Sequence, residues 1–250
     1  LVYSAVSCKN IEGRDFSIME YVKNIVSPYS VCKNLTQEEH IKIIMKAALG
    51  LRMIADIGAV HRDIKPDNVF VIRGDSKHVE PEVKIADFGL LDLTERRNMQ
   101  SDSITAQDVR PGTPRFASPE HYDFGCKLDI RADIYSLGLT AYYWITGEHV
   151  NSGEDNAEVL ENLKKRTAKP KRIIEVSNQV RYRGTPVYHF RERGTLAFRY
   201  QELEKVIAKM IHRDRDSRYK DPHEVVHDLD NVLVGKRAEI ADVDIYEVFR

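Results

Sequence analysis

No run of apolar residues in this sequence is long enough to cross a lipid bilayer, and its N-terminus lacks the pattern of a signal peptide. We therefore expect any membrane anchor of the natural protein to lie outside this chain. Cysteines are also scarce, since Cys8, Cys32 and Cys126 are the only three in 250 residues. An odd number of widely separated thiols argues against a disulfide framework or a zinc site. Reduced cysteines of this kind favour a cytoplasmic location.

An excess of charge of either sign is absent as well. The chain has 38 lysines and arginines against 39 aspartates and glutamates, which gives a formal net charge of -1. Both signs are interspersed over most of the chain, so the composition argues against a general binder of nucleic acid. A chain of 250 residues can bury a sizeable core and corresponds to one large domain or two small ones.

The sequence does contain a dense set of chemical groups at His61-Arg62-Asp63-Ile64-Lys65-Pro66-Asp67-Asn68, the 61–68 loop. Asp63 can orient an attacking hydroxyl group and accept its proton, and Lys65 can reach a phosphate during transfer. Asn68 and the downstream Asp87 offer the hard oxygen atoms that Mg²⁺ prefers. Phosphoryl transfer depends mainly on positioning, on Mg²⁺ and on positive charge near the phosphate oxygens. These four residues therefore indicate a site for moving a phosphoryl group.

Two further motifs follow in order, Asp87-Phe88-Gly89 and Ser118-Pro119-Glu120. Together with the 61–68 loop they resemble the eukaryotic-type serine/threonine protein kinase family, which also occurs in bacteria. Ser118 departs from the usual alanine. The resemblance implies transfer of the γ-phosphoryl group of Mg·ATP to a serine or threonine hydroxyl of a protein substrate. It also implies an α+β fold, with a partial N-lobe hairpin and hinge in residues 1–22, a helical C-lobe in 23–235 and a tail in 236–250.

The nucleotide site is assigned by the same resemblance. Met19 would lie at the back of the adenine pocket, at the end of the last N-lobe strand. The backbone of Glu20, Tyr21 and Val22 would form the hinge and hydrogen-bond the adenine edge, and Phe70 would lie under the ring. Taken alone, Met19 is an ordinary core residue, so its assignment depends on its distance from the 61–68 loop. Phe70 taken alone is only an aromatic residue on a strand.

The resemblance also assigns roles to residues around the reacting groups. Thr113 would hydrogen-bond Asp63 and Lys65, which is typical of specificity for serine and threonine rather than tyrosine. Arg62 would bind a phosphate placed on the loop between residues 89 and 112. The hydroxyl groups in that loop are those of Thr94, Ser101, Ser103 and Thr105. The alternative is an exposed arginine beside unmodified serines.

Three buried contacts are implied in addition. Asp133 would hold the backbone of the 61–68 loop, because a buried carboxylate needs donors that offset its desolvation. Arg218 would form a buried ion pair with Glu120. His61 would pack under Phe88 rather than act as a catalyst.

Periodicity and capping patterns predict the secondary structure. Strands are expected over 1–8, 15–22, 69–72 and 83–86, and the first two are expected to form a hairpin. Helices are expected over 129–146, before Pro170, and around 203–210. Two more are predicted to begin with capping boxes, one at Thr36 and Glu39 that runs to Gly58, and one at Asp221 and Glu224 that runs to Gly235.

Two parts of the family's ATP site are missing from this chain, namely the G-x-G-x-x-G strand pair and the lysine that precedes the hinge. Lys9 is the only lysine before the hinge. The gap between Lys9 and Glu20 cannot hold the helix whose glutamate pairs with that lysine in the family. We therefore expect a kinase domain truncated within its N-lobe and inactive as this chain alone.

Two alternative functions are consistent with parts of this pattern. A kinase-like scaffold that binds and regulates without catalysis would have the same fold, and the missing lysine keeps this hypothesis open. A small-molecule kinase of the aminoglycoside or choline type shares Asp63 and Asn68. Those enzymes lack the Lys65 pattern, the Thr113 element and the Ser118-Pro119-Glu120 ending, which favours the protein kinase.

Overall fold

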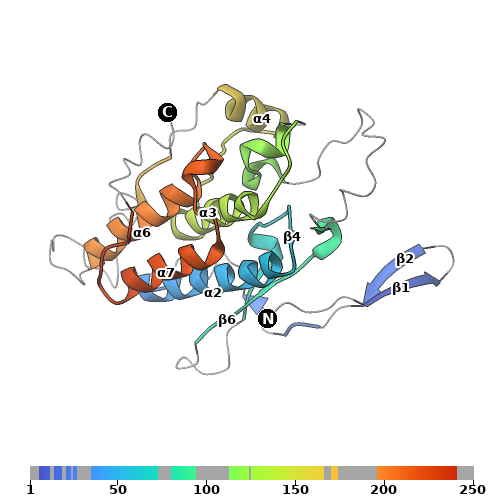
Figure 1. The fold of residues 1–250 in the computed structure, drawn as a ribbon, viewed down its shortest axis with the longest axis horizontal. Coiled ribbons are helices and arrows are strands. Elements are labelled where there is room, and N and C mark those ends of the chain that lie inside the picture. The colour runs from blue at the N-terminus through green and yellow to red at the C-terminus, as the bar shows by residue number, and fades with distance from the viewer. Residues whose placement is uncertain are drawn as a thin grey trace.

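The computed structural model describes residues 6–11, 14–18, 21–23, 25–26, 35–72, 80–93, 113–123, 125–165, 170–173 and 196–240. Within these ranges the chain is mainly helical, with three small antiparallel sheets (Figure 1). This agrees with the α+β fold expected from the sequence, while the division into residues 1–22, 23–235 and 236–250 stays a prediction. No helix of the described ranges is long and apolar enough to span a membrane.

The described strands form three separate antiparallel sheets. β1 (Val6–Ile11) pairs with β2 (Arg14–Ile18). A second sheet has the order β3-β5-β6, in which β3 is Ile25–Val26, β5 is Val69–Ile72 and β6 is Glu82–Ile85. In the third, β4 (Ala59–Val60) pairs with β7 (Asp92–Leu93).

The N-terminal hairpin is present, but its predicted bounds were wrong. β2 ends at Ile18, which pairs with Val6, and residues 21–23 form no strand. The prediction extended this strand to Val22 because Tyr21 and Val22 are residues that favour strands. A strand also needs a partner, and the ladder among the described residues ends at the Val6 and Ile18 pair.

The short pairings of β3 and β7 were not predicted, because two-residue strands have no periodicity. Ile25 and Val26 pair with Ile72 and Val71, so the segment that follows the proposed hinge lies beside the strand that carries Phe70. β7 brings the chain after Gly89 back beside β4, the strand that leads into the 61–68 loop.

The helices of the described ranges are α2 (Gln37–Asp56), α3 (Ile130–Thr146), α4 (Asn156–Lys165), α6 (Leu196–Met210) and α7 (Pro222–Leu233). The capping box predicted for α2 is confirmed, because the Glu39 amide donates to Thr36 Oγ1 at 3.2 Å and the Glu39 carboxylate accepts from the Thr36 amide at 2.7 Å. Gly58, with φ of 65°, follows the C-cap residue Ile57, so the helix stops before this glycine as predicted.

The start of α7 differs in one detail from the prediction. Asp221 caps the helix as expected, accepting a hydrogen bond from the His223 amide at 2.6 Å. The Glu224 carboxylate accepts from the amide of Lys220 at 3.0 Å and not from that of Asp221, so it does not complete a capping box. The Glu224 carboxylate thus gives a hydrogen-bond acceptor to the amide of the residue before the N-cap.

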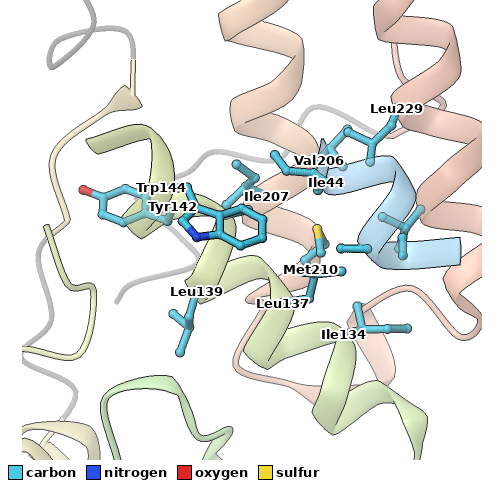
Figure 2. Close-up of a cluster of buried hydrophobic side chains, with 14 of the residues drawn as sticks. Ile44, Ile134, Leu137, Leu139, Tyr142, Trp144, Val206, Ile207, Met210 and Leu229 are labelled. Atoms are coloured by element: carbon cyan, nitrogen blue, oxygen red, sulfur yellow. The ribbon is translucent and has the colours of Figure 1, made fainter. Parts of the chain in front are cut away.

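The core is built where α2, α3, α6 and α7 meet. α2 contacts α3 and α7, and α6 contacts the same two helices (Figure 1). In α3, 12 of 17 residues are buried, so this helix is surrounded on nearly every side, as its apolar sequence predicted. Figure 2 shows its side chains facing those of α2, α6 and α7, among them Ile44, Leu137, Trp144, Ile207, Met210 and Leu229.

Gly138 allows α3 and α6 to approach closely. A Cβ atom at this position would lie 2.6 Å from Ile211 Cγ2 and 2.8 Å from Met210 Cβ, closer than real Cβ contacts. The absence of a side chain therefore sets the spacing of these helices. This spacing matters for function, because α3 also carries Asp133.

Glu120 and Arg218 form the predicted buried ion pair. Arg218 Nη1 and Nη2 donate to the two carboxylate oxygens of Glu120 at 2.6 and 2.9 Å, and the Arg218 side chain is 0% exposed. All five guanidinium N–H groups have acceptors, because the backbone carbonyls of Arg131, His212 and Arg213 take the others. Burial would raise the pKa of Glu120, and the Arg218 guanidinium outweighs this effect and holds that pKa below its ordinary value. The pair ties the Ser118-Pro119-Glu120 segment to the C-terminal helices.

We expect Arg218→Ala to lower the free energy of unfolding by about 3–5 kcal/mol, because it leaves the buried Glu120 carboxylate without its partner. The measurement is chemical denaturation followed by circular dichroism. Arg52→Ala is the matched control, since Arg52 pairs with Asp56 on the exposed face of α2 and such pairs contribute about 0.3–0.5 kcal/mol. Equal denaturation midpoints for the two variants would contradict the burial of the Glu120 pair.

Candidate functional site

The 61–68 loop lies between β4 and β5, and its last residues form a short 3₁₀ turn, Pro66–Asn68. Lys65 Nζ lies 2.6 Å from Asp63 Oδ2. Asn68 Nδ2 donates to the same carboxylate oxygen at 3.1 Å and to the Asp63 carbonyl at 2.8 Å. The 61–68 loop thus brings the side chains of Asp63, Lys65 and Asn68, three of the four proposed catalytic residues, into direct contact.

Thr113 supplies the fourth side chain from a segment 50 residues further along. Its Oγ1 accepts a hydrogen bond from Lys65 Nζ at 3.0 Å and donates to Asp63 Oδ1 at 3.3 Å. The Thr113 amide also donates to Asp63 Oδ1, at 3.3 Å. The predicted contacts of Thr113 with both residues are therefore present, and its role in specificity stays a prediction.

The Asp63 carboxylate is held from both sides. Lys65 and Asn68 donate to Oδ2, and Thr113 donates to Oδ1. The side chain of Asp63 is 10% exposed and that of Lys65 is 21% exposed, so both still reach solvent. A carboxylate fixed in this way keeps one orientation and remains accessible to a substrate hydroxyl, which is what a general base requires.

Asp133 holds the backbone of the 61–68 loop from α3. It lies in the first turn of α3, is 0% exposed, and accepts hydrogen bonds from the amides of His61 at 2.7 Å and Arg62 at 2.8 Å. Burial raises the pKa of Asp133 to about 7, while the two N–H donors favour the charged form. The predicted contact with the loop backbone is present, and it holds the residues immediately before Asp63.

Asp87 follows a residue that binds the backbone of Asn68. The Ala86 amide donates to the Asn68 carbonyl at 2.8 Å, which joins the end of β6 to the end of the 61–68 loop. Asp87 has a left-handed backbone, with φ of 64°, and its exposed carboxylate accepts from the Gly89 amide at 3.3 Å. A Cβ atom on Gly89 would lie 3.2 Å from Asp87 Oδ1, so glycine leaves room for this turn.

These two residues fit the requirements of a Mg²⁺ site in part. Asn68 Nδ2 donates to Asp63, which leaves its Oδ1 as the atom that could ligate a cation, and Asp87 offers a carboxylate. The described residues contain no cluster of three or more His, Cys, Asp and Glu side chains with metal-binding geometry. A cation held by Asn68 and Asp87 would therefore complete its shell with phosphate oxygens and water, as Mg²⁺ commonly does.

His61 packs against Phe88, as predicted. Its ring meets Phe88 edge to face with centroids 5.3 Å apart, and Nε2 lies 3.0 Å from the Ala86 carbonyl. Burial lowers the pKa of His61 below its ordinary value, which favours the neutral ring, and the proton lies on Nε2 because the carbonyl can only accept. This residue links the 61–68 loop to the Asp87-Phe88-Gly89 turn.

The proposed adenine pocket is described only in part. Phe70 is half-buried on β5, Val22 is half-buried, and Tyr21 is 83% exposed. The predictions for Met19 and Glu20 lie outside the described residues, as do those for Thr94, Ser101, Ser103 and Thr105. The assignment of these residues to ATP binding stays a prediction.

One contact of the site was not predicted. His121 follows Glu120, is 1% exposed, and its Nε2 lies 3.2 Å from the Arg62 carbonyl. Ser118 stands three residues before His121, which is the spacing of a capping box, although that motif usually has Glu or Gln at the last position. In the structure Ser118 and His121 bond to each other, but this spacing gives no indication of the contact between His121 and Arg62.

We expect Asp133→Asn to lower the free energy of unfolding by about 1–3 kcal/mol, the usual cost of leaving a buried polar group unsatisfied. An asparagine amide can accept from one backbone N–H, but its NH₂ group faces the other. Chemical denaturation measures the loss, and amide hydrogen exchange at His61 and Arg62 should accelerate.

The control for this variant is Asp230→Asn, an exposed carboxylate on α7. Protection of the His61 and Arg62 amides that is unchanged in Asp133→Asn would show that Asp133 does not hold the loop.

Comparison with known proteins places this geometry in context. Residues 9–229 match the family model described as "Protein kinase domain". The chain is 28% identical over 225 residues to a probable serine/threonine-protein kinase of Clostridium perfringens, which covers 87% of this chain and 27% of that protein. It is 33% identical over 134 residues to the serine/threonine-protein kinase Pkn1 of Myxococcus xanthus, which covers 54% of this chain and 18% of that protein.

Solved structures give the same result for the fold. The twitchin kinase region from C. elegans superimposes with a TM-score of 0.62 at 20% sequence identity, over 87% of this chain and 33% of that one. The chain therefore spans a third or less of each of these three proteins. The match to the family model reaches from β1 to α7 and includes the whole site described above.

Proposed function

Because this chain belongs to the protein kinase domain family, we propose that its Asp63 site transfers the γ-phosphoryl group of ATP to a serine or threonine hydroxyl of a protein. The observation that carries the proposal is the Asp63 carboxylate, oriented by Lys65, Asn68 and Thr113 and still open to solvent. Relatives named as serine/threonine-protein kinases support the choice of acceptor.

The residues have separate tasks in this mechanism. Asp63 aligns the attacking hydroxyl and takes its proton, since its carboxylate is the fixed acceptor at the centre of the site. Lys65, whose ammonium group lies between Asp63 and Thr113, adds positive charge where the phosphoryl oxygens become more negative. Most of the rate enhancement in such transfers comes from positioning and electrostatics, so rigid support of Asp63 is the main requirement.

Protein kinases in general use ATP with Mg²⁺. When bound, Mg²⁺ neutralises charge on the phosphate oxygens, and Asn68 Oδ1 and the Asp87 carboxylate are the groups of this chain that would hold it. Asp87, with its left-handed backbone, directly follows Ala86, whose amide binds the Asn68 carbonyl at the end of the 61–68 loop. The two residues thus orient the nucleotide, while Asp63 and Lys65 act on the group in transfer.

Thr113 supports specificity for short hydroxyl side chains. Because it bonds Asp63 and Lys65 at once, the chain at residue 113 lies directly against the general base. A substrate hydroxyl must reach Asp63 beside this segment, and serine or threonine carries that hydroxyl close to its own backbone. A tyrosine hydroxyl would hold the substrate backbone a full ring length further away.

Asp63→Asn in the natural full-length protein should reduce kcat by about 10²–10⁴-fold, the usual contribution of a positioned general base. The affinity for ATP should change little, because Asp63 acts on the hydroxyl and not on the nucleotide. Phosphate transfer to a protein substrate measures the first quantity and calorimetric titration with ATP measures the second.

Asp230→Asn, on the exposed face of α7, is the control for a lost carboxylate.

Asp87→Asn should give the opposite pattern and weaken the binding of Mg·ATP. Equal transfer rates for wild type and Asp63→Asn would refute this role for Asp63, and tight nucleotide binding without any transfer by wild type would favour the scaffold hypothesis.

Autophosphorylation of the natural protein should place phosphate on serine or threonine. The reason is the short reach to Asp63 beside Thr113. Acid hydrolysis of the labelled protein and separation of the phosphoamino acids decides the question. Phosphotyrosine as the main product would show that Lys65 and Thr113 do not set the specificity in the way proposed.

A further inference from the structure

His121 holds a central position that the proposed mechanism has not used. It lies in the 3₁₀ turn Pro119–Tyr122, and both it and Ser118 are buried, with 1% and 0% exposure. Nδ1 of the ring accepts a hydrogen bond from the Ser118 amide at 3.2 Å and lies 2.8 Å from Ser118 Oγ. Nε2 lies 3.2 Å from the Arg62 carbonyl. The ring therefore bridges two segments 59 residues apart.

The partners of the ring determine its tautomer. A backbone N–H can only donate, so Nδ1 of His121 must be the unprotonated acceptor opposite Ser118. A backbone carbonyl can only accept, so Nε2 must carry the hydrogen and donate it to Arg62. His121 thus works as one acceptor and one donor, fixed at opposite edges of a rigid ring.

The Arg62 carbonyl is a sensitive place for such a contact. Arg62 has φ of 72°, a left-handed conformation that non-glycine residues adopt only where surrounding contacts enforce it. Asp133 holds the amide of Arg62 at 2.8 Å, and His121 holds its carbonyl. The unusual backbone conformation immediately before Asp63 is therefore fixed from α3 on one side and from the Ser118–His121 segment on the other.

The carbonyl of Arg62 and the amide of Asp63 belong to the same planar peptide unit. The Asp63 amide donates to Nδ1 of His61 at 3.4 Å, while His121 binds the carbonyl at the opposite edge of that plane. Two buried imidazole rings thus set the rotation of this peptide plane. Its rotation determines the direction in which the Asp63 side chain leaves the backbone.

The other end of the His121 contact is anchored as well. Ser118 and Glu120 belong to the segment that Arg218 ties to the C-terminal helices. We propose that His121 is a positioning residue for Asp63, which transmits the anchored position of residues 118–120 to the Arg62–Asp63 peptide plane through its Nε2–H. This role rests on the proposed kinase function, since it concerns the orientation of the base in that reaction.

The test compares two substitutions in the natural full-length protein. His121→Leu fills similar space without polar atoms, whereas His121→Gln keeps an acceptor and a donor at the end of its side chain. We expect a fall in kcat of about tenfold or more for the leucine variant, since small misplacements of catalytic groups can cost up to about 10²-fold. KM for ATP should stay unchanged, and glutamine should restore most of kcat. His223→Leu, at an exposed position on α7, is the control.

Amide hydrogen exchange separates positioning from loss of fold, and it does not depend on activity. In His121→Leu the Asp63 amide should exchange faster, while amides in the core of α3 keep their protection. In His121→Gln the Asp63 amide should keep wild-type protection. A leucine variant with wild-type kcat and wild-type protection at Asp63 would overturn the proposal.

Equal loss of protection in α3 and at Asp63 would also overturn it, because His121 would then act only on global stability. If the leucine variant does not fold, His121→Gln decides alone, since wild-type kcat and protection are then required. Wild-type protein that transfers no phosphate would refute the proposed function, and the exchange at Asp63 would still decide whether His121 holds the peptide plane.

Discussion

The rest of the site depends on the hydrogen bonds between the Asp133 carboxylate and the backbone of the 61–68 loop. It is fully buried at the start of α3, and it accepts the backbone N–H groups of His61 and Arg62. Buried charge is tolerated only with such donors, and buried backbone N–H groups need acceptors in turn. Each side of this contact therefore stabilises the other. Because 12 of the 17 residues of α3 are buried, the contact transfers the rigidity of the core to the residue before Asp63.

A second anchor fixes the segment that closes the site. The Glu120 and Arg218 pair satisfies all five guanidinium donors, and it holds residues 118–120 against the C-terminal helices. Thr113 and His121, on either side of this segment, then contact Asp63 and the Arg62 carbonyl. The two anchors explain how a loop of irregular backbone can keep a precise geometry. Catalysis by positioning requires this, since a transfer without covalent help from the protein gains mainly from fixed alignment.

The site could be predicted from the sequence to the level of residue types and order. The side chains of Asp63, Lys65, Asn68 and Asp87 are the groups that phosphoryl transfer needs, so their order in the sequence indicates the reaction. The contacts of Thr113, Asp133 and Arg218 followed from the family resemblance. His121 was missed because its neighbour Arg62 is close in space but 59 residues away in sequence, and a single histidine has no periodicity. β3 and β7 were missed for a related reason, because two residues are too few to show alternation.

The sequence by itself determined the helices, the capping box of α2 and the chemical groups of the site. These depend on local properties: the 3.6-residue repeat that buries one face of α2, the apolar sequence of α3, the hydrogen bonds between Thr36 and Glu39, and the acidity or charge of individual side chains. Only the tertiary structure decided which groups meet. The left-handed backbone of Arg62, the tautomer of His121 and the orientation of Asp63 result from contacts between segments far apart in the chain, and no local preference of these residues would produce them.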